Sequence, residues 1–399
     1  MKKEKLFKMF SLINEYSLYA ILFFIPISKA IPEVFFTFAI ISFFGKKIIK
    51  PEFKVFRSNY NFFLAIFILF SALSLFNSPP FLAKSLIALI FKWCKFIWLF
   101  LFFQDAVTDR RKANKAVVIF VISAALVSID CIFQKFTGFD FFRHYDLAFM
   151  GNGIYAVRAA FNNYNDLAAY LVVSISLIFT LAEYMRGKLK FVLSIFLVTS
   201  TIAFLLTFSR GGWIGLLSSL VFILVISKKY RIFAAFFISF LLVVLLTPET
   251  RERFMFIFQQ GGDANRFINW GIALDMVKQN PLLGTGVGTF IDHFPRDKTW
   301  VIIGYAHNCF LQIWAETGIF SLLSFLLFLG TFLYKAIQLF RSTKDYLALG
   351  LAAGLFGYIV HSVFDTHFYS LQLSFLFWSV SGLLASLICI NRAQESKVP

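Results

Sequence analysis

The chain has 399 residues, of which 59% are hydrophobic and 15% charged, and its formal net charge is +17. A soluble domain carries about 25% charged residues, so this composition excludes an ordinary soluble protein and favours one that crosses a membrane. Most lysines and arginines lie in short gaps between apolar runs, as in cytoplasmic loops under the positive-inside rule. We therefore attribute the positive charge to membrane topology and expect no nucleic-acid partner.

Apolar runs long enough to cross the hydrocarbon core of a bilayer recur along the chain. Together they predict an all-α polytopic membrane protein that forms a single integral membrane domain over residues 1–399. Pro26 and Pro32 interrupt the first two runs, so the boundaries there are the hardest to place. The twelve predicted helices cover about residues 14–30, 32–45, 60–76, 81–103, 114–135, 167–184, 190–207, 212–227, 232–247, 318–334, 346–364 and 369–390.

The distribution of lysine and arginine predicts how these helices are oriented. If the N-terminus is cytoplasmic, the segments on that side hold 24 basic residues, whereas the segments on the opposite side hold 10, spread over a longer stretch of chain. Both termini are therefore expected to face the cytoplasm. Two external segments are too long to be simple turns: a smaller loop at residues 136–166 and a large loop at 248–317, between the ninth and tenth helices.

The large external loop contains a predicted amphipathic helix and a glycine-rich segment. Asp263 or Asn265 can cap a helix that Pro281 stops, and this helix would lie on the membrane surface or over the helix bundle. Arg266 falls in its first turn, either as a solvated arginine or as the partner of an anion bound to the free backbone N–H groups. The glycine-rich segment 284–288 lacks the preceding strand of a dinucleotide site, so a turn or close backbone packing is expected.

His307 lies near the end of the same loop, ahead of a short apolar segment that ends at Gly318. A glycine there is typical of the residue that follows a helix C-terminus, so the tenth span is expected to begin after it. His307 would then start a short helix at the outer membrane surface. A single histidine is usually structural, but an unperturbed pKa of about 6.5 suits proton transfer, and the same loop carries Arg266.

Other polar residues lie at predicted external helix ends. Arg210 is in the turn before the eighth span, where it either snorkels to lipid headgroups or joins the N–H groups of a helix capped by Ser209 to seat an anion. Arg158 precedes the sixth span. His361 and Asp365 are four residues apart at the end of the eleventh span and are expected to touch, as a structural pair or as part of a site.

The fourth span carries Lys84, Lys92 and Lys95, which share one face if the whole span is α-helical. Lys84 is nearest the outer surface and is expected to join an external site, whereas the other two are expected to snorkel inward. The scattered cysteines and the spacing of His307 are not typical of a metal site. Arginine grips phosphate through two hydrogen bonds, so a diphosphate on a lipid carrier would suit the external basic residues Lys84, Arg158, Arg210 and Arg266.

In their order along the chain, these motifs resemble the bacterial O-antigen ligase and polymerase superfamily. The similarity covers about residues 150–335 well and the first four spans by topology alone. It rests on residues 161–171 (FNNYNDLAAYL), 208–212 (FSRGG), 266–290 (R…W…NPLLGTGVGTF) and 307–318 (HN…ETG).

The resemblance implies a GT-C-like glycosyltransferase that takes a glycan from an undecaprenyl diphosphate carrier. In ligases the acceptor is a sugar hydroxyl of lipid A–core, and in polymerases it is a second carrier-linked repeat unit. The resemblance further implies that Arg210 and Arg266 bind the donor diphosphate and that His307 is essential. Asp365 resembles an acidic residue that the family keeps in its last external turn, and Lys84 is a looser match.

We therefore expect an O-antigen ligase of the bacterial inner membrane, with its site facing the periplasm and with inverting chemistry that uses neither a metal nor a cofactor. His307 would be the base or would orient the acceptor, with Asp365 and His361 in support. A polymerase that uses the same donor is the first alternative. A transporter or flippase for a lipid-linked glycan is the second, although transporters usually bind at mid-membrane and the polar groups here gather at one face.

Overall fold

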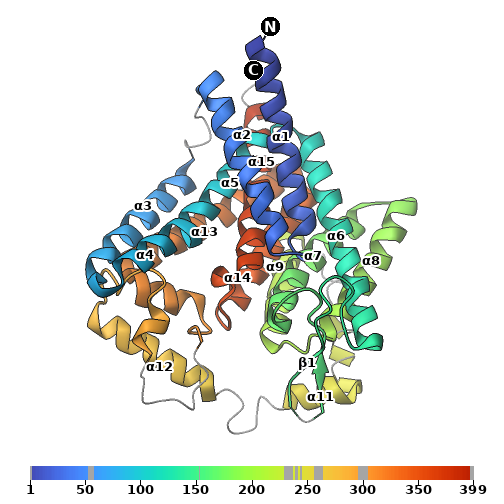
Figure 1. The fold of residues 1–399 in the computed structure, drawn as a ribbon. Coiled ribbons are helices and arrows are strands. Elements are labelled where there is room, and N and C mark those ends of the chain that lie inside the picture. The colour runs from blue at the N-terminus through green and yellow to red at the C-terminus, as the bar shows by residue number, and fades with distance from the viewer. Residues whose placement is uncertain are drawn as a thin grey trace.

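The computed structural model is a bundle of long helices that run between two ends of the molecule (Figure 1). Within the part of the chain that the structure describes, eight helices are long and apolar enough to span a membrane. The prediction of an all-α polytopic membrane protein is confirmed, but the predicted ninth span, 232–247, falls largely outside that part. The structure describes residues 2–52, 58–151, 153–228, 237–238, 241–242, 245–255, 264–294 and 304–395.

The helices follow the apolar runs of the sequence, and short helical turns join some of them. The α-helices are α1 (Lys2–Phe24), α2 (Ala30–Ile49), α3 (Asn59–Leu73), α4 (Leu82–Ala88), α5 (Lys95–Ala106), α6 (Arg110–Thr137), α7 (Tyr164–Tyr184), α8 (Gly187–Leu205), α9 (Arg210–Ser227), α11 (Pro248–Met255), α12 (Ala264–Gln279), α13 (Cys309–Thr343), α14 (Tyr346–His361) and α15 (Leu371–Glu395). The short turns are η2 (Ser74–Asn77), η3 (Pro79–Phe81), the π-helical η4 (Leu89–Cys94), η6 (Phe290–His293) and η7 (His367–Tyr369).

The first two helices differ most from the prediction. α1 begins at Lys2 rather than near residue 14, because the charged N-terminal stretch continues the helix and Glu4 pairs with Lys8 one turn later, at 3.5 Å. α1 then ends at Phe24, just before Pro26, since proline cannot continue the backbone hydrogen-bond pattern. The predicted boundaries were therefore wrong at both ends of this span.

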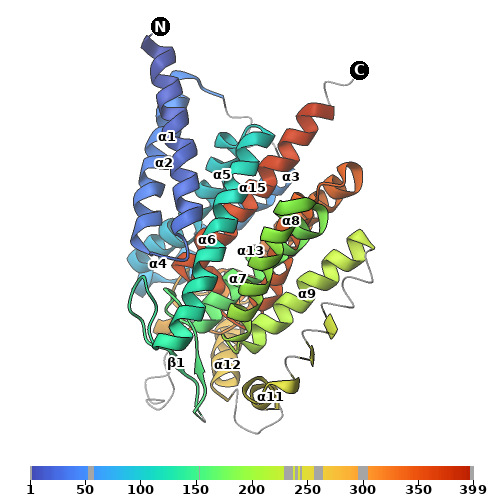
Figure 2. The same cartoon turned by 90° about the vertical axis from the view of Figure 1, so that its right-hand side faces the viewer.

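The two ends of the bundle carry different features. The start of α1 and the end of α15 lie at one end, whereas α12 and the short strand β1 (Ala148–Phe149) lie at the other (Figure 1, Figure 2). At the end that holds the termini, the Asp105 carboxylate forms ion pairs with both Lys46 and Lys47. This clustering of basic side chains fits the expectation that both termini are cytoplasmic, which stays a prediction.

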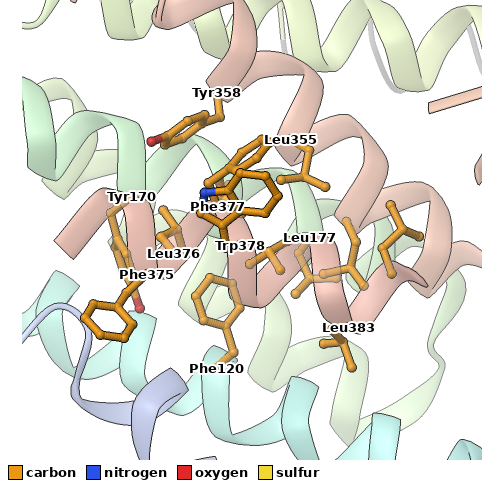
Figure 3. Close-up of a cluster of buried hydrophobic side chains, with 14 of the residues drawn as sticks. Phe120, Tyr170, Leu177, Leu355, Tyr358, Phe375, Leu376, Phe377, Trp378 and Leu383 are labelled. Carbon is orange, nitrogen blue, oxygen red and sulfur yellow. The ribbon is translucent and has the colours of Figure 1, made fainter. Parts of the chain in front are cut away.

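The core of the bundle lies where α6, α7, α14 and α15 meet. Figure 3 shows aromatic side chains from these four helices packed together, among them Phe120, Tyr170, Tyr358 and Trp378. All four are at most 1% exposed. Because lipid tails are as apolar as these side chains, close packing rather than transfer from water holds such helices together.

Glycines on α14 allow this helix to approach its neighbours closely. A Cβ atom on Gly354 would lie 2.9 Å from the carbonyl oxygen of Val173 in α7. A Cβ atom on Gly357 would lie 2.6 Å from the carbonyl oxygen of Gly215 in α9. α14 is therefore held tightly between α7 and α9, which fixes the position of His361 at its end.

The smaller external loop connects α6 to α7 and folds back on itself. β1 pairs with β2 (Tyr155–Ala156) in an antiparallel hairpin that places Ala148 opposite Ala156. The side chain of Gln134, near the end of α6, accepts the backbone N–H of Arg158 at 2.9 Å and that of the following residue at 2.8 Å. The loop is thus anchored to a membrane-spanning helix.

The large external loop contains α12, close to the predicted helix. Pro281 follows its last residues, as expected, and Asn265 lies within the helix. The other candidate cap, Asp263, lies outside the described residues. α12 buries Ile272 and Met276 in a cluster that includes residues of the first part of α13, so this helix lies over the bundle, which was one of the two predicted locations.

α13 consists of two helices joined at Gly318, as the sequence predicted. Gly318 has φ 79° and ψ 172°, a conformation that is essentially restricted to glycine. The backbone N–H of Thr285 donates to the carbonyl of Ala315 at 3.1 Å, and that of Ile319 donates to the carbonyl of Pro281 at 3.0 Å. The loop that follows α12 therefore packs directly against the kink.

The kink gives a stability prediction. Replacing Gly318 with alanine is expected to destabilise the protein by at least about 2 kcal/mol, because the new Cβ would also lie 2.0 Å from the carbonyl oxygen of Leu282. Gly330 is a matched control in the same helix, since a Cβ there meets nothing within 4 Å and alanine favours helix. Thermal unfolding in detergent compares the two variants, and equal melting temperatures would contradict the prediction.

Candidate functional site

His307 lies just before α13 and faces Asp365, which is in the turn between α14 and η7. The His307 Nδ1 atom is 3.2 Å from the Asp365 Oδ1 atom, and the two side chains are 34% and 6% exposed. An ionised carboxylate can only accept hydrogen bonds, so the Nδ1–H of His307 donates to it. The Nε2 atom then keeps its lone pair, and His307 can accept a proton from a substrate.

The backbone around His307 fixes the position of its side chain. His307 has φ 50°, in the left-handed region that strains a residue with a β-carbon. Asn308, the next residue, caps α13 by accepting two backbone N–H groups of the first turn at 3.0 Å. The N–H of Cys309 donates to the carbonyl of Ser362 at 2.9 Å, which ties the start of α13 to the end of α14.

Asp365 remains ionised although it is buried. Burial alone would raise the pKa of Asp365, but the hydrogen bond from His307 holds that pKa well below its usual range. The backbone N–H of Thr366 also donates to the carboxylate, at 2.8 Å. A permanent negative charge beside Nδ1 is what fixes the tautomer of a histidine.

The predicted contact between His361 and Asp365 is not the one observed. α14 ends at His361, so Asp365 does not lie one turn further along the same helix. Instead, the His361 ring packs edge-on against the ring of His367, with 4.2 Å between centroids. His367 was missing from the prediction because its position depends on the turn after α14 and not on any helical spacing. His361, Asp365 and His367 nevertheless form one cluster, in which Asp365 contacts His307.

His367 is expected to make the stability of the folded protein depend on pH. Burial lowers the pKa of His367 from 6.5 to about 4. Between these values the unfolded chain binds a proton that the folded chain does not bind, so stability falls as the pH decreases through this window. The expected loss is on the order of 3 kcal/mol. Melting temperatures in detergent from pH 7 to 4 should fall less steeply for His367→Asn than for the wild type; identical slopes would contradict this assignment.

The two arginines implied by the resemblance come from helix starts that approach His361. Arg210 is the first residue of α9, whose cap, Ser209, accepts the N–H of Gly212 at 3.2 Å. A Cβ on the next residue, Gly211, would lie 2.8 Å from the His361 ring. Arg266, in the first turn of α12, is close enough for its charge to act on His361. Two helix N-termini that each carry an arginine are well suited to an anion.

Three buried polar atoms in this cluster have no hydrogen-bond partner among the described residues. They are His361 Nδ1, Asp365 Oδ2 and His367 Nε2. Buried polar atoms in proteins are nearly always paired. Their concentration next to His307 is therefore typical of a site that receives a polar ligand.

Lys84 and Arg158 contact other residues than those of this cluster. The Lys84 ammonium binds both carboxylate oxygens of Asp292 at 2.7 and 2.6 Å. The Arg158 Nε–H donates to the carbonyl of Asp146 at 2.7 Å, and its guanidinium stacks over Tyr145 at 5.0 Å. Both side chains hold external loops in this structure, and their binding of a donor stays a prediction.

The lysines of the fourth span do not behave as predicted. The π-helical turn η4 separates α4 from α5, and its i→i+5 hydrogen bonds change the rotation per residue. Lys84 and Lys92 face residues of the large loop, whereas Lys95 pairs with Glu33 of α2 at 2.6 Å. The expectation of one shared face was wrong, as was the expectation that Lys92 and Lys95 snorkel inward.

The glycine-rich segment 284–288 packs closely against α13. Close backbone packing was one of the two roles that the sequence predicted for it. A Cβ on Gly284 would lie 2.4 Å from the backbone of Glu316. The fully buried Glu316 carboxylate accepts the N–H of Gly288 at 2.8 Å and the hydroxyl of Tyr369 at 3.2 Å. Glu316 belongs to the HN…ETG motif, but the sequence assigned no role to Glu316 or to Tyr369, because their partners are distant along the chain.

Comparison with known proteins bears on this arrangement. Residues 195–326 match the protein family described as O-antigen ligase (Wzy_C). The matched segment includes Arg210, Arg266 and His307, while Asp365 lies beyond it. No curated protein matches the chain. The similarity that the motifs indicated is therefore confirmed over residues 195–326 of this multi-pass membrane protein.

Proposed function

We propose that the protein is an O-antigen ligase that transfers a glycan from undecaprenyl diphosphate to a sugar hydroxyl of lipid A–core. The observation that carries the proposal is the pairing of His307 with Asp365 beside two helix starts that bear Arg210 and Arg266. The family match supports ligase- or polymerase-type activity in general. The identities of the donor and the acceptor go beyond what this match supports, and we propose them here.

In the proposed reaction, the acceptor hydroxyl oxygen attacks the anomeric carbon of the donor sugar from the face opposite the carrier. A new carbon–oxygen bond forms while the bond to the diphosphate oxygen breaks. The diphosphate leaves with the bonding electron pair, so the anomeric configuration inverts. The hydroxyl proton passes to Nε2 of His307, and the charge that grows on the leaving diphosphate is stabilised by Arg210 and Arg266.

Asp365 is a positioning residue in this mechanism. It holds Nδ1–H of His307, so that Nε2 is available as the base, and it stabilises the imidazolium that forms when the proton arrives. In the part of the chain that the structure describes, no group of three or more His, Cys, Asp or Glu side chains is placed to hold a metal ion. We propose that these steps use protein side chains alone.

We further propose that the site opens to the periplasm from the bacterial inner membrane, with both termini in the cytoplasm. Two observations support this orientation. Basic residues such as Lys46 and Lys47 gather at the end of the bundle that holds the termini, as cytoplasmic segments do. α12, which carries Arg266, lies at the opposite end (Figure 1).

The lipopolysaccharide of a deletion strain tests this function. We expect loss of the O-antigen ladder on a gel, with accumulation of polymer that remains linked to the carrier. A plasmid that encodes the wild type should restore the ladder, and one that encodes His307→Ala should not.

Each alternative function gives a different result in the same strain. A polymerase would leave single carrier-linked repeat units rather than a carrier-linked polymer. A flippase would be indicated if the purified protein scrambled carrier lipids between bilayer leaflets without forming a glycosidic bond. Either result would overturn the assignment as a ligase.

A further inference from the structure

A π-helical turn interrupts the fourth membrane segment, at η4 between α4 and α5. Turns of this kind are rare and frequently lie at functional sites. Lys92 is within this turn and is partly exposed. Of the three lysines in the segment, Lys84 and Lys95 each bind a carboxylate at 2.6 Å. Lys92 has no carboxylate partner within ion-pair distance among the described residues, which leaves its charge available to a ligand.

The Lys92 ammonium lies between two aromatic rings. Its Nζ atom is 5.5 Å from the centre of the Tyr305 ring and 5.4 Å from that of Tyr369. The two rings are themselves in contact, with 5.5 Å between their centroids. Cation–π contacts of this length hold an ammonium in place without neutralising it. The flat faces of tyrosine rings also suit the C–H groups of a sugar.

The surroundings of this lysine are closely packed. A Cβ atom on Gly288 would lie 2.7 Å from Ala88 and 3.5 Å from Lys92 Nζ, so only glycine leaves room there. The N–H of Gly288 and the hydroxyl of Tyr369 both donate to the buried Glu316 carboxylate. These bonds hold the glycine-rich segment and one of the two rings in fixed positions next to Lys92.

This cluster adjoins the catalytic pair but is built from other elements. Tyr305 is two residues before His307, and Tyr369 is four residues after Asp365. Arg210 begins α9, whose next residue, Gly211, packs against the His361 ring, and Arg266 lies in the first turn of α12, whereas Lys92 comes from η4. The proposed transfer needs two lipid-linked sugars at the same time. The arginines suit the diphosphate of the donor, so the second cationic position is available to the acceptor.

We propose that Lys92, Tyr305 and Tyr369 form the acceptor subsite, with Lys92 binding a phosphate of the lipid-linked acceptor and the tyrosine faces packing against its sugar. This inference rests on the proposed function and deepens it. The ligand class is a phosphorylated, lipid-anchored saccharide. The phosphate comes from lipid A–core in a ligase, or from a second carrier-linked unit in a polymerase.

Steady-state kinetics with purified protein in liposomes test the subsite. Lys92→Met removes the charge and keeps much of the side-chain volume, Lys92→Arg keeps the charge, and Lys95→Met removes a neighbouring lysine that pairs with Glu33. We expect Lys92→Met to raise KM for the acceptor about 10- to 100-fold with little change in KM for the donor. Lys92→Arg should recover most of the acceptor affinity, and Lys95→Met should match the wild type.

A second arm identifies the chemical group that Lys92 binds. Wild type should use phosphorylated lipid A–core with a lower KM than the dephosphorylated form, and Lys92→Met should lose this difference. If carrier-linked repeats but not lipid A–core show the effect, the subsite holds and its phosphate is that of a carrier. Absence of any transfer by the wild type would refute the proposed function. Transfer by the wild type with unchanged acceptor KM in a folded Lys92→Met variant would refute the subsite alone.

Discussion

Replacing His307 with alanine is expected to lower the rate of glycan transfer about 10²- to 10⁴-fold, the usual contribution of a general base. His307 is the histidine whose Nδ1–H is held by a buried carboxylate, so Nε2 is free to take a proton. The loss should appear in kcat, because the proton moves only during the chemical step. Transfer from a lipid-diphosphate donor in liposomes measures it.

His144 supplies a matched control for this substitution. It is an exposed histidine of the smaller external loop, and its φ of 53° is close to the 50° of His307. The two alanine variants therefore meet similar backbone constraints, and only one lacks the proposed base. We expect His144→Ala to retain wild-type activity. A His307→Ala protein that folds and keeps its full rate would remove His307 from the mechanism.

Replacing either Arg210 or Arg266 with alanine is expected to lower the rate of glycan transfer about 10²- to 10³-fold. Losses of this size are typical when a group that stabilises charge in the transition state is removed. Lysine at either position should restore only part of the rate, because lysine lacks the planar fork that binds phosphate through two hydrogen bonds. Arg143→Ala is the control, since that guanidinium stacks over Tyr145 in the smaller external loop. Its rate should stay near that of the wild type.

The double variant shows whether the two arginines hold one ligand. If both bind the same diphosphate, the effects should be coupled, and the double variant should lose less than the product of the two single losses. Fully multiplicative losses would mean that Arg210 and Arg266 act at separate places, and this would contradict the proposal that they bind one diphosphate.

Much of the fold could be predicted because the signals are local. Apolar runs mark the helices, Pro281 marks the end of α12, and Gly318 marks the kink in α13. The importance of His307 could be suspected for the same reason, since it lies between a polar loop and the helix that ends at this glycine. The family motifs then added Arg210 and Arg266, which lie in the first turns of α9 and α12.

The remainder depends on geometry that no local pattern contains. The π-helical turn η4 changes the helical phase after Lys84, so a rotation of 100° per residue misplaced Lys95. The end of α14 at His361 turned Asp365 towards His307 instead of back along its own helix. Glu316 and Tyr369 form a hydrogen bond although 53 positions separate them in the sequence. No periodic pattern in the sequence predicts a contact between residues so far apart.

The partners of the basic side chains also depend on distant parts of the chain, so the sequence could not distinguish these residues from one another. From the sequence, Lys84 and Arg158 resembled Arg210 and Arg266 as basic residues at an outer surface, and no local pattern indicated the oxygen atoms that bind them. Lys92 looked like a snorkelling lysine, yet it lies against two tyrosine rings that come from segments more than 200 residues away.

The most direct test of the central claim is the product formed by purified protein in liposomes with an undecaprenyl diphosphate-linked glycan and lipid A–core. We predict one glycosidic bond between glycan and core with inverted anomeric configuration, release of undecaprenyl diphosphate, and a rate at least about 100-fold lower for His307→Ala. A product with retained configuration, or no bond formed by the wild type, would contradict the claim that His307 activates an acceptor hydroxyl for direct displacement of the carrier.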